Sequence, residues 1–318
     1  MKVLKIVGIV IAVLLVTAIG VYAWTSHAAG RKLSKTYATH TVDFPVPSPV
    51  RAQDVRNAAG SGDRAHAEAM ERGRHLVAAR YGCTECHGTD FGGGVMVDNP
   101  AIGRLLGPNL TTGKGSVTLE YTAADWDRIV RHGIKRDGTP GLMPSQDFQA
   151  MTDQELADIV VFIRSQPPVD SQVPAPKLGP VGRALIASGK LPLSADLIGS
   201  HDRPHAVSPP EAGATVEFGR HVAATCVGCH RSDLGGGTIV GGDPAWPPAA
   251  NLTPGSDGLG EWTFTHFSQA MREGKRPDGT TLRPPMANVS TYAQKMSETE
   301  LQALWKYLRS VPPVRDRE

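Results

Sequence analysis

The sequence contains two short segments of the same pattern, Cys83–His87 (Cys-Thr-Glu-Cys-His) and Cys226–His230 (Cys-Val-Gly-Cys-His). They hold all four cysteines of the 318-residue chain, so no odd thiol is left over. A disulfide framework would scatter cysteines more widely along the chain. Two paired cysteines followed each time by a histidine therefore favour cofactor or redox chemistry.

Both segments lie at the same place within a longer repeat. Glu71–His75 (Glu-Arg-Gly-Arg-His) precedes the first pair of cysteines, and Glu217–His221 (Glu-Phe-Gly-Arg-His) precedes the second. The offset between matching residues stays between 141 and 146 along the whole stretch, so the chain contains a duplicated domain. Further matching segments follow in the same order: Gly92–Gly94 with Gly235–Gly237, Asn109–Thr111 with Asn251–Thr253, Asp137–Thr139 with Asp278–Thr280, Met151–Leu156 with Met296–Leu301, and Arg164–Val169 with Arg309–Val314.

Each copy predicts three helices, which indicates a mainly α fold. The first helix precedes the cysteines, over about 67–79 and 212–224. Thr122 and Thr263 suit the start of the second, because a hydroxyl oxygen accepts an N-terminal backbone N–H. The third begins with a capping box, in which a Ser or Thr and a Glu three residues later bond each other's backbone, and it ends before two prolines. The capping boxes are Thr152–Glu155 and Ser297–Glu300, and the proline pairs are Pro167–Pro168 and Pro312–Pro313.

Cys-x-x-Cys-His is the signature of covalent haem attachment. Two thiols add to the vinyl groups of the porphyrin, and the adjacent histidine lies under the iron, so one rigid ring fixes the spacing of three side chains. The sequence therefore predicts two covalent haem c groups. The attachment residues are Cys83, Cys86, Cys226 and Cys229, and the proximal iron ligands are His87 and His230.

Two other uses of the cysteines are less consistent with the sequence. A zinc site that united both pairs would join cysteines 143 residues apart, and it would ignore both histidines. A thioredoxin-like dithiol requires a βαβ context that the sequence does not predict.

The sixth iron ligand is predicted to be a methionine. Met143 follows His87 by 56 residues, and Met286 follows His230 by the same distance, each beside a proline in a predicted loop. The alternative is that both are core methionines that fill gaps. A rival pair also repeats but is expected at the start of a helix: Met151 and Met296.

Ligation by two histidines is disfavoured. His132 has Glu273 as its counterpart, so it does not repeat. His75 and His221 do repeat, but they lie on the first helix before the cysteines, where we expect surface or packing residues.

Other repeated positions predict how each domain is built. Gly73 and Gly219 are expected to let the first and last helices cross closely, under the rings of Phe162 and Tyr307. The segments at Asn109 and Asn251 are expected near the proximal histidine, where a backbone carbonyl accepts the Nδ1 proton and orients the ring. The carbonyls in question are those of Pro108 and Ala250, and Tyr121 and Trp262 are expected at the haem edge or propionates.

The N-terminus predicts a membrane helix. Nineteen residues without a charge run from Ile6 to Trp24, after Lys2 and Lys5. This length crosses a hydrocarbon core of about 30 Å as a helix, and the basic residues favour a cytoplasmic N-terminus. A cleaved signal peptide, cut after Ala28, is the alternative. Either reading places the remaining chain on the periplasmic side of the inner membrane.

Composition and charge separate the domains. Residues 1–65 carry eight Lys and Arg against three Asp and Glu. The sequence has no basic patch with interleaved aromatic residues, which is the pattern typical of nucleic-acid binding. Residues 169–211 contain seven prolines and are expected to form an extended connector. The expected domains are 1–24 (anchor or uncleaved signal), 25–65 (stalk), 66–168 (first haem domain), 169–211 (connector) and 212–318 (second haem domain).

Both halves resemble class I cytochrome c domains, over about 66–169 and 212–314. The resemblance implies two tandem α-helical domains with one haem each, behind the transmembrane helix. The departure from the pattern is Ala250, where the first half has Pro108, and it keeps the backbone carbonyl.

The whole chain is similar to membrane-anchored dihaem cytochromes, which implies electron transfer rather than catalysis. The implied partners are a dehydrogenase, a quinol-linked complex or a terminal oxidase. A dihaem peroxidase or sulfur-compound dehydrogenase remains an alternative, although it requires an open or unusual sixth position. A role as the cytochrome subunit of a dehydrogenase complex is a further alternative.

Overall fold

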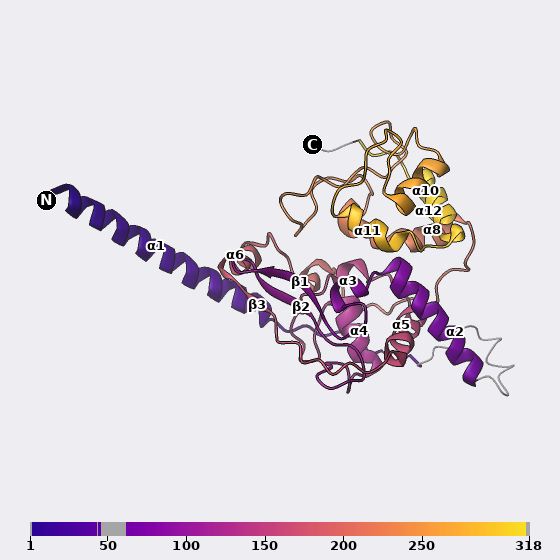
Figure 1. Cartoon of the computed structure of the whole chain (residues 1–318), viewed down its shortest axis with the longest axis horizontal. Coiled ribbons are helices and arrows are strands. Elements are labelled where there is room, and N and C mark those ends of the chain that lie inside the picture. The colour runs from indigo at the N-terminus through magenta and orange to yellow at the C-terminus, as the bar shows by residue number, and fades with distance from the viewer. Residues whose placement is uncertain (1, 43, 46–61, 316–318) are drawn as a thin grey trace.

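The long N-terminal helix α1 (Lys2–Leu33) extends beyond the apolar stretch. The computed structural model describes residues 2–42, 44–45 and 62–315, and α1 projects from the rest of the molecule (Figure 1). It is long and apolar enough to cross a membrane. Its last turns pack on the connector, where Ala29 contacts a small core with Ile186, and Lys32 Nζ donates to the Ile186 carbonyl at 2.9 Å. Residues 25–33 of the expected stalk are therefore helical, and residues 46–61 lie outside the described residues.

We call residues 62–168 domain 1 and residues 212–315 domain 2; Figure 1 shows them as two separate groups of helices. The mainly α fold is confirmed. Domain 1 contains α2 (Gly62–His75), the short π-helix η2 (Leu76–Arg80), α3 (Thr84–His87), β1 (Gly94–Asn99), β2 (Gly103–Gly107), α4 (Ala123–His132), the 3₁₀ turn η3 (Ser145–Asp147) and α5 (Asp153–Ser165). Domain 2 contains α8 (Val216–Ala223), η4 (Ala224–Cys226), α9 (Val227–His230), α10 (Phe264–Glu273), α11 (Met286–Ala293) and α12 (Glu298–Ser310).

The helix caps are those that the sequence predicts. Thr122 and Thr263 accept the N3 backbone N–H groups of α4 and α10. Thr152 caps α5 and Ser297 caps α12, each in a reciprocal capping box with the expected glutamate. Because capping depends on residues three apart in the chain, it can be predicted from the sequence without the tertiary structure.

The close crossing of the first and last helices is also confirmed in both domains. A Cβ at Gly73 would overlap the carbonyl oxygen of Asp158 on α5, and one at Gly219 would overlap that of Ala303 on α12. The Cβ atoms of Phe162 and Tyr307 are the next contacts. No side chain fits at either glycine, and the last helix of each crossing contributes to the apolar core of its domain.

The connector is more structured than its prolines suggest. It forms β3 (Lys177–Leu178), α6 (Pro180–Ser188) and α7 (Ser194–Leu197). β3 pairs antiparallel with β2, and β2 with β1, in a three-stranded sheet. A Pro at N1 has the backbone angle that a helix needs, so Pro180 starts α6. The connector therefore packs on domain 1 before it reaches domain 2.

Candidate cofactor-binding sites

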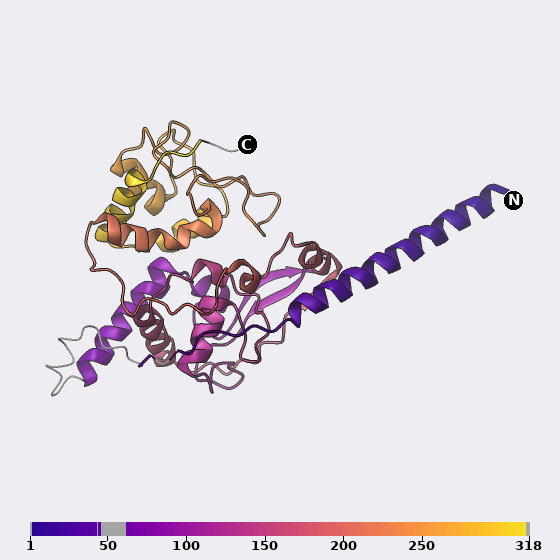
Figure 2. The same ribbon diagram turned by 180° about the vertical axis from the view of Figure 1, so that it is seen from behind.

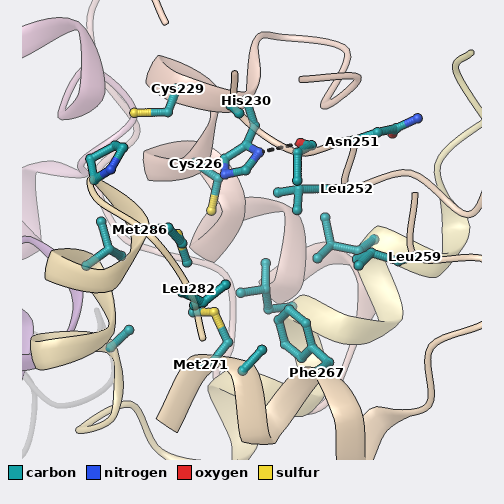
Figure 3. Close-up of a pocket in the computed structure, with 18 of the residues that line it drawn as sticks. Cys226, Cys229, His230, Asn251, Leu252, Leu259, Phe267, Met271, Leu282 and Met286 are labelled. Carbon is teal, nitrogen blue, oxygen red and sulfur yellow. Dashed lines mark hydrogen bonds between the residues drawn. The ribbon is translucent and has the colours of Figure 1, made fainter. Parts of the chain in front are cut away.

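Domain 2 encloses a cavity of about 590 Å³. Cys226, Cys229 and His230 lie on one wall, and Met286 and Met271 project from the facing elements (Figure 3). Most of the remaining lining is apolar. It includes Leu252, Leu259, Phe267, Leu282, Leu304 and Leu308. Two thiols and an imidazole at the edge of an apolar cavity are the donor set that a covalently attached haem requires, so the residues present fit haem c.

The histidine of each Cys-x-x-Cys-His segment is oriented by a backbone carbonyl, as expected. His230 Nδ1 donates to the Ala250 oxygen at 2.7 Å, and His87 Nδ1 donates to the Pro108 oxygen at 3.0 Å. A carbonyl can only accept, so the proton lies on Nδ1 and Nε2 keeps its lone pair. Burial lowers the pKa of both histidines, which keeps the imidazoles neutral. Both rings are thus in the form that ligates iron.

None of the four cysteines forms a disulfide. Burial raises the pKa of Cys226 to about 11 and that of Cys83 to about 12. A thiol with so high a pKa carries little thiolate, which is the form that binds zinc and attacks disulfides. Within the described residues, none of the four belongs to a group spaced to hold a metal ion. Both observations weigh against a zinc site and a reactive dithiol.

Met143 and Met286 take different local structures. Met143 lies in a bend before η3 and is half-buried against the core of domain 1. Met286 is the first residue of α11 rather than part of a loop, and it lines the same cavity as His230. The rival residues Met151 and Met296 are core residues, 2% and 6% exposed. Met296 also reaches the cavity wall.

Met271 on α10 is a cavity residue that the sequence analysis did not single out. Its counterpart in domain 1 is Val130, so a search for repeated residues passes over it. Its position on the buried face of a capped helix is the signal that would have found it. Trp262, just before the N-cap of this helix, lines the cavity as expected, while its counterpart Tyr121 packs edge-on against Trp126.

Domain 1 completes the cysteine-bearing wall of the domain 2 cavity. Arg80 and Asp147 both line it. Asp147 lies against Gly228, where a Cβ would overlap the carboxylate, so the glycine between the two cysteines permits this contact. Burial raises the pKa of Asp147 to about 6. On the other side of the interface, a Cβ at Gly82, next to Cys83, would lie 3.0 Å from Cε1 of Tyr292.

Two histidines that were expected as surface or packing residues instead join the domains. His75 Nε2 lies 2.8 Å from Glu300, and His221 Nε2 lies 2.8 Å from Glu155, so the two contacts are equivalent under exchange of the domains. Arg80 donates to Glu155 at 2.8 Å and lies 3.9 Å from Glu300. The capping glutamates of α5 and α12 therefore also form the polar centre of the interface.

Two α-helical units, each built around a Cys-x-x-Cys-His helix and a carbonyl-oriented histidine, define a protein of the c-type cytochrome class. The family model described as Cytochrome c matches residues 70–167 and 216–312. The chain belongs to the cytochrome c family.

Two similar proteins are named as cytochrome subunits of dehydrogenases. The fructose dehydrogenase cytochrome subunit of Gluconobacter japonicus is 28% identical over 301 residues, which cover 89% of this chain and 60% of that protein. The cytochrome c subunit of alcohol dehydrogenase (quinone) from Gluconobacter oxydans (strain 621H) is 29% identical, over 78% of this chain and 56% of that protein. The chain thus spans less than two thirds of the length of these two relatives.

A shorter relative matches over most of its own length. The protein named diheme cytochrome c-type from Cereibacter sphaeroides is 23% identical, over 73% of this chain and 83% of that protein. Its name agrees with the count of two attachment segments here.

Proposed function

We propose that this chain transfers electrons through two haem c groups, one in each domain. Haem c supplies a redox-active iron when it is attached. The observation that carries the proposal is the repeated geometry of His87 and His230, whose Nδ1 atoms both donate to a carbonyl and leave Nε2 for the metal. The cysteines that would hold the two groups are Cys83, Cys86, Cys226 and Cys229.

The domain interface supports transfer within the chain. Gly82 precedes Cys83 and contacts Tyr292 of domain 2, while Gly228 lies between two cysteines and contacts Asp147 of domain 1. Both attachment segments therefore border the interface. The contacts of His75 with Glu300 and of His221 with Glu155 link α2 to α12 and α8 to α5 across it, which holds the domains in one orientation. A fixed orientation keeps the two sites at a constant separation.

The partner proposed here is a dehydrogenase at the periplasmic face of the inner membrane. The relatives named as cytochrome subunits of fructose, alcohol and gluconate dehydrogenases support this assignment. α1 supports a membrane location, since its apolar turns are exposed along the helix. Co-purification of a dehydrogenase with this chain from detergent-solubilised membranes tests the partner. Purification of the chain alone, with undiminished electron transfer to a quinone or oxidase, would favour a free carrier instead.

The sixth ligands give the test of the sites. We propose Met143 and Met286, and the ferric protein should then show the weak near-infrared charge-transfer band of thioether-ligated iron. Met143→His should remove about half of it and lower one reduction potential, because thioether ligation raises the potential of a haem. Met286→His should do the same for the other domain.

Matched variants separate ligation from packing. Met151→Leu keeps the volume of a core residue and should leave the band intact. Met271→Leu, close to Met286 in the domain 2 cavity, also keeps the side-chain volume and should leave the band intact. If Met271→Leu removes half of the band and Met286→His does not, Met271 is the ligand in domain 2. Two covalently bound haems per chain in a denaturing gel, and one in Cys86→Ser or Cys229→Ser, are expected alongside.

A further inference from the structure

Four side chains from three separate segments converge beside α4, and none of them lines the domain 2 cavity. His40 comes from the segment after α1, Asp127 and His132 from α4, and His205 from the connector. One nitrogen or oxygen atom of each lies within 4.8 Å of one atom of every other. The side chains of Asp127 and His132 are 1% exposed and that of His205 is 8% exposed.

The proton positions follow from the hydrogen bonds around the cluster. His201 Nε2 faces the Ala195 carbonyl at 3.0 Å, so it carries the proton and Nδ1 of a neutral ring is an acceptor. His132 Nδ1 lies 3.0 Å from that acceptor and must donate to it. Nε2 of a neutral His132 therefore has a bare lone pair, directed into the cluster.

A second imidazole is oriented in the same way. His40 Nδ1 faces the His201 carbonyl at 3.2 Å and donates to it, which leaves Nε2 unprotonated. The third imidazole, that of His205, directs its Nε2 at Nε2 of His132.

The bare lone pair of His132 faces a nitrogen and a carboxylate oxygen. His205 Nε2 and His132 Nε2 are 3.1 Å apart, a distance that a proton on His205 Nε2 or a metal ion between the two nitrogens can bridge. Asp127 Oδ2 is buried, has no hydrogen-bond partner among the described residues, and lies 3.5 Å from His132 Nε2. Buried acceptors without donors are costly, and a cation between them removes that cost.

The spacing is that of ligands around a small tetrahedral ion. Two ligand atoms about 2.0 Å from a tetrahedral zinc lie roughly 3.3 Å apart. The separations from His132 Nε2 are 3.1 Å to His205 Nε2 and 3.5 Å to Asp127 Oδ2, and His205 Nε2 lies 3.7 Å from the other Asp127 oxygen. Small shifts of the side chains would bring all of them into the coordination sphere.

The charge around the cluster also favours a cation. Asp127 Oδ1 accepts from Arg131, and the same guanidinium donates to Asp153 at 2.7 Å, so two carboxylates share one positive group. A metal ion binds the lone pair of a neutral imidazole, and the Nε2 atoms of His132 and His40 offer such a lone pair to the cluster.

We propose that His40, Asp127, His132 and His205 bind one divalent transition-metal ion, for which zinc is the best fit. Three imidazole nitrogens and one carboxylate form a closed set of four ligands, as in structural zinc sites. His201 is a positioning residue, because its Nδ1 fixes the tautomer of His132. The ion would hold both the segment after α1 and the connector against domain 1. In Figure 2 this indigo segment runs across the face of domain 1.

The test uses the full-length holoprotein in detergent. The protein is stripped with EDTA, reloaded with Zn²⁺ alone and passed through a desalting column, and zinc per chain is measured by mass spectrometry. One zinc per chain is expected, with X-ray absorption showing imidazole ligands at about 2.0–2.1 Å. The zinc-loaded chain should also unfold at a higher temperature than the stripped chain.

Variants assign the ligands. Asp127→Asn and His205→Gln should retain no zinc, and His201→Gln should weaken zinc binding by about 10–100-fold, as loss of an orienting partner does. His66→Gln, a change at an exposed histidine of α2, should retain one zinc. His40→Gln alters a half-buried residue outside domain 1 and should also weaken zinc binding. It therefore tests the site even if Asp127→Asn in α4 fails to fold.

Two results would overturn the site. The first is an unmodified chain that retains no zinc after reloading. The second is a His40→Gln, His205→Gln double variant that retains as much zinc as the unmodified chain. Neither result bears on electron transfer, because no residue of the cluster belongs to the proposed haem sites.

Discussion

Domain 1 has seven residues between His75 and Cys83, whereas domain 2 has four between His221 and Cys226. In domain 1 this segment begins with the five-residue π-helix η2, which ends at Arg80. The guanidinium lies between Glu155 and Glu300, so an insertion in one copy supplies a group that both copies use. π-Helical turns are rare and often occur at functional sites.

A second difference lies at the ends of α4 and α10. The helices have equal lengths and similar caps, but His132 in domain 1 corresponds to Glu273 in domain 2. His132 is fully buried among histidines from segments that contact domain 1, whereas Glu273 is exposed and pairs with Lys275. The two copies thus share the backbone carbonyls that accept from His87 and His230, while each copy differs where it meets the rest of the chain.

The largest effect is expected at Arg80. Arg80→Ala removes the cation from between Glu155 and Glu300, and loss of one partner of a buried ion pair costs about 3–5 kcal/mol. Denaturant unfolding of the holoprotein measures this loss. Arg104→Ala is the matched control, since its exposed pair with Asp98 should contribute at most about 1 kcal/mol. Equal losses in the two variants would show that the interface does not depend on Arg80.

The same interface predicts acid sensitivity. Burial raises the pKa of Glu155, but the His221 hydrogen bond and Arg80 outweigh it and lower the pKa to about 2. Because the folded-state pKa lies below the ordinary value of 4.5, this stabilisation is present above about pH 4.5 and is lost as the pH falls towards 2. The loss should amount to about 3 kcal/mol.

Unfolding free energies between about pH 5 and 2 test the assignment. Glu155→Gln should show a smaller decrease than the unmodified chain, and so should His221→Gln, which removes the main bonding partner. Identical pH profiles in all three proteins would rule out Glu155 as the source.

The helix crossings should respond alike in both domains. Gly73→Ala and Gly219→Ala each force a Cβ against a carbonyl oxygen, and overpacking of this kind costs about 1–3 kcal/mol. Thermal unfolding of each variant measures the loss. Gly199→Ala, where nothing lies within 4 Å, should be close to neutral. A loss at one crossing without the other would mean that the two cores differ more than their glycines suggest.

The smallest effect is expected at the caps. Thr122→Ala and Thr263→Ala each remove a hydroxyl that accepts an N3 backbone N–H, at a cost of about 1 kcal/mol. Thr122→Ser and Thr263→Ser keep the acceptor and should restore most of the stability. Denaturant midpoints that do not change in the alanine variants would contradict this role.

The sequence by itself determined the features that depend on short spacing. The cysteine segments, the capping boxes at Thr152 and Ser297 and the glycine crossings at Gly73 and Gly219 all follow from residues near one another in the chain or from exact repetition between the copies. Repetition doubles each local signal, and for this reason the two domains and the carbonyls of Pro108 and Ala250 were predictable.

The tertiary structure alone decided the contacts that join distant segments. His40 and His205 meet α4 only because the segment after α1 and the connector both fold onto domain 1. The pairs His75–Glu300 and His221–Glu155 depend on how the domains are oriented, and Met271 faces the cavity without a repeated partner. Such contacts have no fixed sequence separation, since they form where packing of apolar faces brings the chain together, and no local pattern records that geometry.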